Sequence, residues 1–226
     1  PHLTVKKGMF TFKAEGDDNP NSSRFSRKLH VFSKSSGVTI GRGYDVRDKK
    51  PKQIKKDLVA AGINSKTADK LKNATGLTGD KARKWIQKEN LGNLKITRQQ
   101  QKSLFEIEYR RITKTAMKMI KKYTKNALKF KDLHPVAKDI VVDIFYRGDY
   151  SMSDSKKKSD SVYMQKAFDK LSKHNLIALI QLMADQAFWV YKAGVDEARA
   201  KARAMYVYDA CCGNDSRLTC KANCAG

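Results

Sequence analysis

Three side chains close to the start of the sequence are of the types that hydrolyse a glycosidic bond. Glu15 follows the apolar residues around Phe12, and Thr39 and Asp45 belong to the segment GVTIGRGYD. This hydrolysis needs two carboxyl groups in different environments, so that one donates a proton while the other activates a water. Apolar neighbours help a carboxyl group keep its proton, which suits Glu15 to the donor role. Asp45 and the Thr39 hydroxyl would then activate and hold the water.

The elements expected to position these residues are a short helix and a hairpin. The β-branched run Val38-Thr39-Ile40 predicts a strand, and Gly41 and Gly43 are suited to backbone conformations with positive φ. We expect a hairpin within residues 30–46, with Ser35-Ser36-Gly37 as its turn, facing a helix over 9–16 that carries Glu15. The structural alternative is that Glu15 merely caps its helix and Asp45 ends a turn. A dinucleotide-binding loop is disfavoured because a third glycine is missing at the required spacing.

At these residues the sequence resembles a known family. The segments around Glu15 and Thr39 look like the catalytic region of the pesticin-type lysozymes, bacterial toxin domains homologous to phage T4-type lysozyme. Together the similar blocks span about residues 9–208. They are Glu15, Asn19-Pro20-Asn21-Ser22, Phe25-Ser26-Arg27, Gly37 to Asp45, Asp143-x-x-Tyr146-Arg147-Gly148-Asp149-Tyr150, Met183-Ala184-Asp185-x-x-Phe188-Trp189 and Ala198 to Arg203.

The resemblance implies a muramidase that cleaves the β-1,4 bond between N-acetylmuramic acid and N-acetylglucosamine in peptidoglycan. It implies that Glu15 is the general acid, that Asp45 works on water and that Thr39 positions this water. The threonine precedes the aspartate here, as in the pesticin-type enzymes and unlike the phage enzymes. The substrate contacts expected beside them are Arg42, Tyr44, Arg147 and Tyr150. No cofactor and no metal are expected.

The resemblance also implies a setting for the protein. Its partners would be peptidoglycan, anionic wall or surface polymers and an immunity protein. We expect a monomer that is secreted or delivered to the periplasm of a target cell. The sequence does not begin with Met and shows no signal peptide, which is consistent with a mature secreted form or with a domain cut from a larger toxin.

The charge of the chain predicts an anionic partner. Lysine and arginine number 47 against 23 acidic residues, which gives a formal net charge of +24 at pH 7. Such a surface attracts peptidoglycan and teichoic acids, and it attracts nucleic acid equally well. The alternative function is therefore a basic protein that binds nucleic acid or an anionic surface on a lysozyme-like fold without catalysis. No zinc-finger or basic-zipper pattern accompanies the charge.

Length and pattern predict a mostly helical α+β protein with one small β-hairpin and a long connecting helix. The resemblance implies that these elements form the lysozyme-like arrangement of a small β-hairpin lobe and a helical lobe joined by the long helix. The 226 residues, 40% of them hydrophobic, suffice for a buried core. No apolar run is long enough to cross a membrane. We divide the chain into a muramidase domain over 1–208 and a cysteine-rich tail over 209–226. Helices are expected at 9–16, 51–61, 65–74, 79–89, 97–123 and 135–147, with two or three more over 162–207, and a polar loop at 151–161.

The four cysteines all lie in the tail, at Cys211, Cys212, Cys220 and Cys224. The adjacent pair can bridge each other only with strain, so we expect two disulfides to the later cysteines, in either connectivity. A zinc site is the alternative, although C-x2-C spacing and a nearby histidine are missing. Disulfides would suit an oxidising compartment.

Several other residues have simpler interpretations. Asp143 and Asp149 bracket Arg147, which predicts an internal ion pair, with a saccharide contact by Arg147 or Tyr150 as the functional alternative. The histidines His30, His134 and His174 are scattered and none is expected to be catalytic. Trp189 beside Phe188 is expected in the core.

Overall fold

The computed structural model describes residues 3–125, 130–213, 218 and 220. The chain forms two compact units, residues 1–111 and 112–226, and the boundary falls inside the long helix α5 (Arg98–Tyr123). Helices make up 59% of the described residues, and the two strands found among them form one small antiparallel sheet. The protein is therefore α+β and mostly helical, as the sequence predicts.

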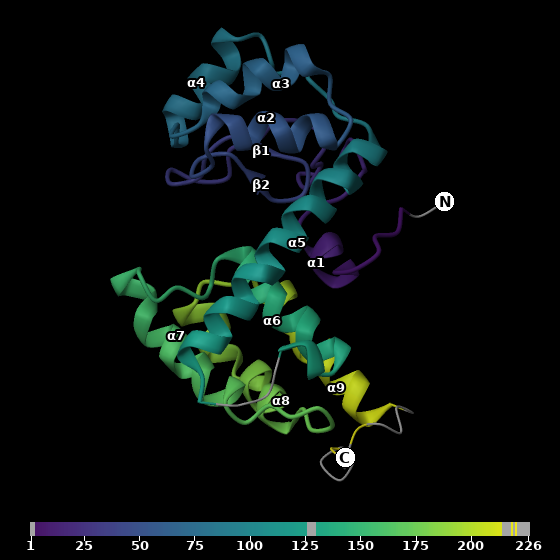
Figure 1. Cartoon of the computed structure of the whole chain (residues 1–226), viewed down its shortest axis with the longest axis vertical. Coiled ribbons are helices and arrows are strands. Elements are labelled where there is room, and N and C mark those ends of the chain that lie inside the picture. The colour runs from purple at the N-terminus through teal and green to yellow at the C-terminus, as the bar shows by residue number, and fades with distance from the viewer. Residues whose placement is uncertain (1–2, 126–129, 214–217, 219, 221–226) are drawn as a thin grey trace. The chain divides into compact units, whose positions relative to one another are not determined.

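The first unit contains a short N-terminal helix, the hairpin and three further helices before α5 (Figure 1). These elements are α1 (Met9–Ala14), β1 (Thr39–Ile40), β2 (Tyr44–Asp45), α2 (Pro51–Ala60), α3 (Ser65–Leu71), a 3-10 turn (Lys72–Ala74) and α4 (Gly79–Lys88). The helices among them lie where the sequence predicts them, within a few residues. At the start of α5, Thr97 Oγ1 accepts from Gln100 N at 3.0 Å and Gln100 Oε1 accepts from Thr97 N at 2.8 Å, which is a capping box.

The hairpin has a different turn from the one expected. β1 and β2 pair in antiparallel register, with Thr39 opposite Asp45, and their turn is Gly41-Arg42-Gly43. Gly41 and Gly43 have φ of 61° and 85°, so the positive φ predicted for both glycines is confirmed. The turn that includes Ser35 and Ser36 makes a second reversal, which brings His30 into an isolated antiparallel bridge with Thr39.

The apolar core of the first unit lies between the hairpin and α2, α3, α4 and α5. The β-branched strand that precedes Gly41 buries Val38 and Ile40 completely, against Ile54 and Leu58 on the inner face of α2. Leu104 on α5 completes the same cluster. This packing fixes the hairpin on a rigid base of helices, so the polar side chains that it carries are held by the core beneath them.

The second unit is helical, and one of its helices overturns an expectation. Its elements are the end of α5, a 3-10 turn (Phe130–Asp132), α6 (Pro135–Arg147), α7 (Ser155–Phe168), α8 (Ile177–Ala184), a π-helical turn (Phe188–Lys192) and α9 (Glu197–Cys212). The polar loop predicted over 151–161 is wrong, because α7 begins within it. Asp154 is the N-cap, accepting from Lys156 N at 2.9 Å, and the helix buries Met164 and Phe168 on its inner face.

A buried ion network holds α6 against α9. Asp143 on α6 accepts from both Arg199 and Arg203 on α9, at 2.6 Å and 2.7 Å. Asp149 accepts from Arg203 at 2.9 Å and also from Arg147. The internal ion pair predicted for Arg147 is thus present with Asp149, while Asp143 has other partners. Burial alone would raise the pKa of Asp143, but the guanidinium groups of Arg203 and Arg199 outweigh it and hold the pKa below its ordinary value.

Helix α9 runs past residue 208 without a break and ends at Cys212. Cys211 and Cys220 form a disulfide with 5.7 Å between their Cα atoms, so one of the expected bridges is present. Cys224 lies outside the described residues, as does most of the segment expected to form a separate tail. Trp189 is fully buried, as predicted, and donates to Leu182 O at 2.8 Å. Among the described residues, no helix has both the length and the apolar character needed to cross a bilayer.

Candidate active site

Thr39 and Asp45 form the centre of the candidate site. They are direct partners across the hairpin, so their side chains project from the same face of the two strands. Thr39 is only 5% exposed, and its hydroxyl has a long contact of 3.5 Å with Gly37 O. Asp45 is half-buried. The arrangement places a hydroxyl and a carboxylate side by side on a rigid element, as the holding of one water requires.

Two backbone N–H groups fix the carboxylate of Asp45. Gly37 N donates to Oδ2 at 3.0 Å and Arg47 N donates to Oδ1 at 2.8 Å. Both oxygens are therefore oriented by main chain rather than by mobile side chains. A Cβ atom at Gly37 would collide with Asp45 Oδ1 and with the Arg47 side chain, so this position requires glycine for the carboxylate to stay in place.

Glu15 lies at the C-terminal end of α1. Its backbone N–H donates to Thr11 O at 2.9 Å, and its side chain is half-buried. Arg24 closes this end of the helix, because its guanidinium donates to the carbonyls of both Ala14 and Lys13. The helix has only six residues, so these contacts and the packing of Phe12 hold Glu15 in position.

Arg42 joins the hairpin to the helix that carries Glu15. From the hairpin turn its Nη1 donates to Phe12 O at 2.7 Å, and its guanidinium lies 3.7 Å from the centroid of the Phe12 ring. Burial lowers the pKa of Arg42, against the opposing effect of Asp18, whose carboxylate lies 3.5 Å away. Arg42 is 7% exposed. We expected it to contact substrate; in the structure it faces inward and connects two parts of the site.

Tyr44 is also directed inward. It is 1% exposed, and its hydroxyl donates to Asp57 on α2 at 2.7 Å. Burial, reinforced by this hydrogen bond, raises the pKa of Tyr44. Asp57 in turn accepts from Arg111 on α5. Tyr44 therefore anchors the hairpin to α2, with almost none of its side chain exposed.

The remaining two expected substrate contacts belong to the second unit. Arg147 donates to Asp149 and to Gly194 O. Tyr150 is 6% exposed, accepts from Gln165 Nε2 at 2.6 Å and stacks on Phe145 with 4.6 Å between ring centroids. Arg42 and Tyr44 thus lie in the first unit with Glu15, Thr39 and Asp45. Arg147 and Tyr150 lie in the second unit, where Tyr150 is buried and Arg147 is half-buried.

His30 belongs to the candidate site, although its sequence position suggested no role. It exchanges two backbone hydrogen bonds with Thr39, at 3.1 Å and 2.8 Å, so it flanks Thr39 on the side away from Asp45. Its Nδ1 bonds to Lys28 O at 3.0 Å. Burial lowers the pKa of His30, partly offset by the Lys28 carbonyl and by the charge of Asp45. The sequence signal was that two β-prone residues, Val31 and Phe32, follow His30 shortly before the β-branched run.

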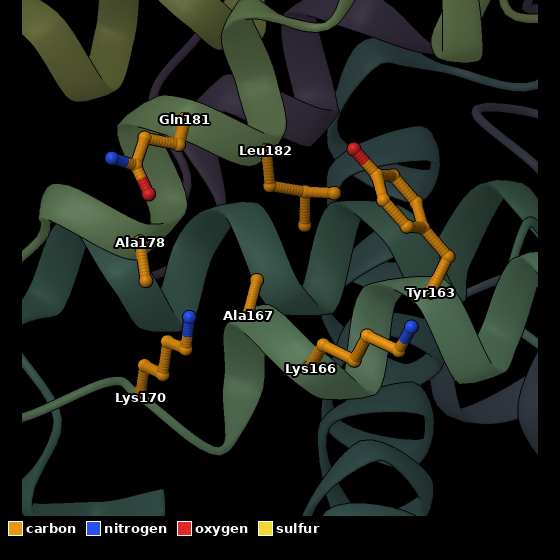
Figure 2. A pocket seen from close by; sticks show the side chains of 7 residues that line it. All are labelled: Tyr163, Lys166, Ala167, Lys170, Ala178, Gln181 and Leu182. Atoms are coloured by element: carbon orange, nitrogen blue, oxygen red, sulfur yellow. The ribbon is translucent and has the colours of Figure 1, made fainter.

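A separate open depression of about 130 Å³ lies between α7 and α8 in the second unit (Figure 2). Two lysines and a glutamine surround a floor of small apolar side chains, and none of the candidate catalytic residues lines it. The lining residues are Tyr163, Lys166, Ala167, Lys170, Ala178, Gln181 and Leu182. Within the described parts of the chain, no three His, Cys, Asp or Glu side chains are grouped so that they could hold a metal ion.

Comparison with known proteins gives the family of the chain. The sequence profile of a family described as a domain of unknown function, DUF8812, matches residues 8–204. The chain belongs to the DUF8812 family. The DUF8812 match begins just before α1 and ends within α9, so it includes every residue of the candidate site and stops before Cys211. No curated protein sequence matches the chain significantly.

Proposed function

We propose that this DUF8812 protein is a muramidase with a lysozyme-like, two-lobed fold, acting on the β-1,4 bond between N-acetylmuramic acid and N-acetylglucosamine. The observation that carries the proposal is the link made by Arg42. Its hydrogen bond to Phe12 O ties the hairpin with Thr39 and Asp45 to the helix that ends at Glu15. A buried guanidinium gives this link a defined geometry, as a site that must hold two carboxyl groups and a water requires.

In the proposed reaction Glu15 donates its proton to the glycosidic oxygen as the bond to the leaving sugar breaks. A water attacks the anomeric carbon from the opposite face, and Asp45 accepts the proton that this water loses. The Thr39 hydroxyl orients the water through the lone pairs of its oxygen. The proposed reaction uses only these side chains and no cofactor. The backbone hydrogen bonds from Gly37 and Arg47 keep the Asp45 carboxylate, which acts as the base, in one orientation.

The charge supports a polymeric anionic substrate. A net charge of +24 concentrates the enzyme at cell walls that carry teichoic acids or the carboxylates of peptidoglycan. The proposed activity requires secretion or delivery to the periplasm of the target cell, and the Cys211–Cys220 disulfide would persist there. A producing cell would need an immunity protein as a partner, and the enzyme would act as a monomer.

The same charge favours a second candidate function, a non-catalytic binder of nucleic acid or of anionic surfaces. A binding function gives no role to the Thr39–Asp45 pair or to the fixed orientation of the Asp45 carboxylate. The two functions differ in what happens to the polymer: the first cuts it, and the second only binds it with strong salt dependence.

Incubation of the protein with purified peptidoglycan distinguishes the two functions. The wild-type protein should release soluble fragments, and reduction followed by mass spectrometry should identify N-acetylmuramic acid at their new reducing ends. A surface variant, Glu197→Gln, is the matched control, because Glu197 is 67% exposed and its ion pair with Lys201 lies on the surface of α9. Intact sacculi that bind the protein tightly at low salt would reject the muramidase and support the binder.

A further inference from the structure

Phe32 is an unusually exposed aromatic side chain next to the candidate site. Its exposed fraction is 76%, although a phenylalanine ring is normally buried when a core is available. It lies two residues after His30, in the segment that reverses direction before β1. Isolated exposed apolar side chains are common and need no explanation. The contacts of Phe32 are what distinguish it.

The ring of Phe32 rests against His30. The two ring centroids are 5.5 Å apart and the planes meet at 80°, an edge-to-face contact. His30 is itself fixed, by the two backbone bonds to Thr39 and by the bond between its Nδ1 and Lys28 O. A chain of direct contacts therefore runs from Thr39 through His30 to an aromatic ring that faces solvent.

The turn that follows Phe32 presents hydroxyl groups. Ser33 Oγ lies 3.1 Å from Ser35 Oγ and 2.8 Å from Ser36 Oγ, and these bonds are exposed. Arg47, whose backbone N–H holds Asp45, also donates through Nη1 to Ser35 O at 2.6 Å. The turn is thus connected to the Asp45 carboxylate on one side, as Phe32 is connected to Thr39 on the other.

We propose that Phe32 and the turn Ser33–Ser36 form a saccharide-binding subsite beside Thr39 and Asp45, with His30 as the residue that positions the ring. An exposed aromatic face suits the apolar C–H face of a pyranose, and neighbouring hydroxyls suit its equatorial hydroxyl and acetamido groups. The ligand class is a neutral β-1,4-linked N-acetylhexosamine chain. The subsite rests on the proposed function, because it gives that enzyme a place for the sugars next to the scissile bond.

The probe is the tetramer of N-acetylglucosamine, and the test begins with the full-length Glu15→Gln variant so that the probe stays intact. Calorimetric titration of this variant should show binding. Adding Phe32→Ala should weaken it roughly three- to tenfold, the range that one lost aromatic contact accounts for. Phe32→Tyr should keep the affinity. Tyr191→Ala is the matched control, because Tyr191 is 87% exposed and lies in the second unit.

His30 is tested through a double-mutant cycle. His30→Ala should weaken tetramer binding about as much as Phe32→Ala, and the two changes together should cost no more than either alone. In the otherwise wild-type enzyme both changes should raise KM for peptidoglycan fragments and leave kcat unchanged, since neither side chain takes part in bond cleavage. If the losses of binding free energy caused by the two changes were fully additive, the positioning role of His30 would be contradicted.

The results separate this inference from the proposed function. If wild-type protein cuts peptidoglycan and Phe32→Ala changes neither tetramer affinity nor KM, the subsite is wrong and the muramidase stands. If the protein cuts nothing but binds the tetramer in a Phe32-dependent way, the subsite stands and the hydrolysis is wrong. Absence of any tetramer binding at millimolar concentration would overturn the subsite.

Discussion

Thr39 and Asp45 are direct partners across the β1–β2 hairpin, with the Asp45 carboxylate held at both oxygens by backbone N–H groups. A hydroxyl and an oriented carboxylate on adjacent strands can hold one water between them. The hairpin is joined to the Glu15 helix through Arg42 and to α2 through Tyr44. Its position therefore depends on side chains that face inward, and these contacts make the consequences of single substitutions predictable.

Replacing Glu15 by Gln should abolish lysis while the protein stays folded. The amide keeps the shape of the side chain but has no proton to donate, and general acid catalysis contributes roughly 10²–10⁴-fold to a rate. Reducing-end assays on purified peptidoglycan measure the loss, and the thermal melting curve checks the fold. Turnover of Glu15→Gln at the rate of Glu197→Gln would remove Glu15 from the mechanism.

Gly37→Ala should abolish the proposed hydrolysis through its effect on Asp45. The new methyl group would occupy the space of Asp45 Oδ1, so the carboxylate must turn away from its two N–H donors. Overpacking of this kind costs about 1–3 kcal/mol of stability, too little to unfold most domains. The control is Gly92→Ala, because a Cβ atom there meets nothing within 4 Å. Peptidoglycan hydrolysis should fall sharply in the first variant only, and equal activities would show that the carboxylate need not be fixed.

The first product should have inverted configuration at the anomeric carbon. If Asp45 activates a water, the two carboxyl groups must leave room for it, at the separation of roughly 6.5–9.5 Å found in inverting enzymes rather than the roughly 5–5.5 Å of retaining ones. Proton NMR during the first minutes of hydrolysis identifies the anomer before mutarotation. A β product would contradict direct attack by a water that Asp45 activates, and would indicate a covalent intermediate instead.

Lysis of whole walls should be far more sensitive to salt than the chemistry itself. The Debye length falls from about 10 Å at 0.1 M to about 3 Å at 1 M, which screens the attraction between the +24 chain and an anionic wall. Hydrolysis or binding of a neutral N-acetylglucosamine oligomer depends only on the local site and should change little. The two salt profiles are compared directly. Parallel profiles would indicate that the basic surface has no role in recruitment to the wall.

Asp143→Asn should destabilise the second unit by about 3–5 kcal/mol, because it leaves Arg199 and Arg203 buried without their shared carboxylate. The pKa of Asp143 is held below its ordinary value in the folded protein, so its contribution is present above the unfolded pKa of about 4 and is lost as the pH falls through the folded value. Urea unfolding between pH 2 and 7 should therefore show a shallower acid loss in the variant.

The control for this prediction is Asp80→Asn. Asp80 is 83% exposed and pairs on the surface with Arg83, an interaction worth little in water. Equal stability of the Asp143→Asn and Asp80→Asn proteins at pH 7 would show that the buried network between α6 and α9 contributes no net stability.

The sequence alone determined much of the local structure, although it misplaced the hairpin turn and the start of α7. Thr97 and Pro135 mark the starts of α5 and α6, and the Gly41-x-Gly43 spacing predicted the positive φ at both glycines. These features depend on capping, on the fixed φ of proline and on the missing Cβ of glycine, which act within a few residues. The helical content and the chemical types in the candidate site follow from the same short-range patterns.

Only the tertiary structure decided where the long-range partners lie. Sequence spacing paired Asp143 with nearby Arg147, whereas its partners come from α9, more than fifty residues later. The sequence suggested that Arg42 contacts substrate, whereas in the fold α1 packs beside it and Arg42 points inward to Phe12. His30 had no local signal beyond the β-prone Val31 and Phe32 that follow it, and it joined Thr39 through a bridge made by the intervening turn. The partner of a buried charge or of an isolated bridge depends on which surfaces the core brings into contact. The residue's own chemistry does not specify which distant segment will lie beside it in the fold.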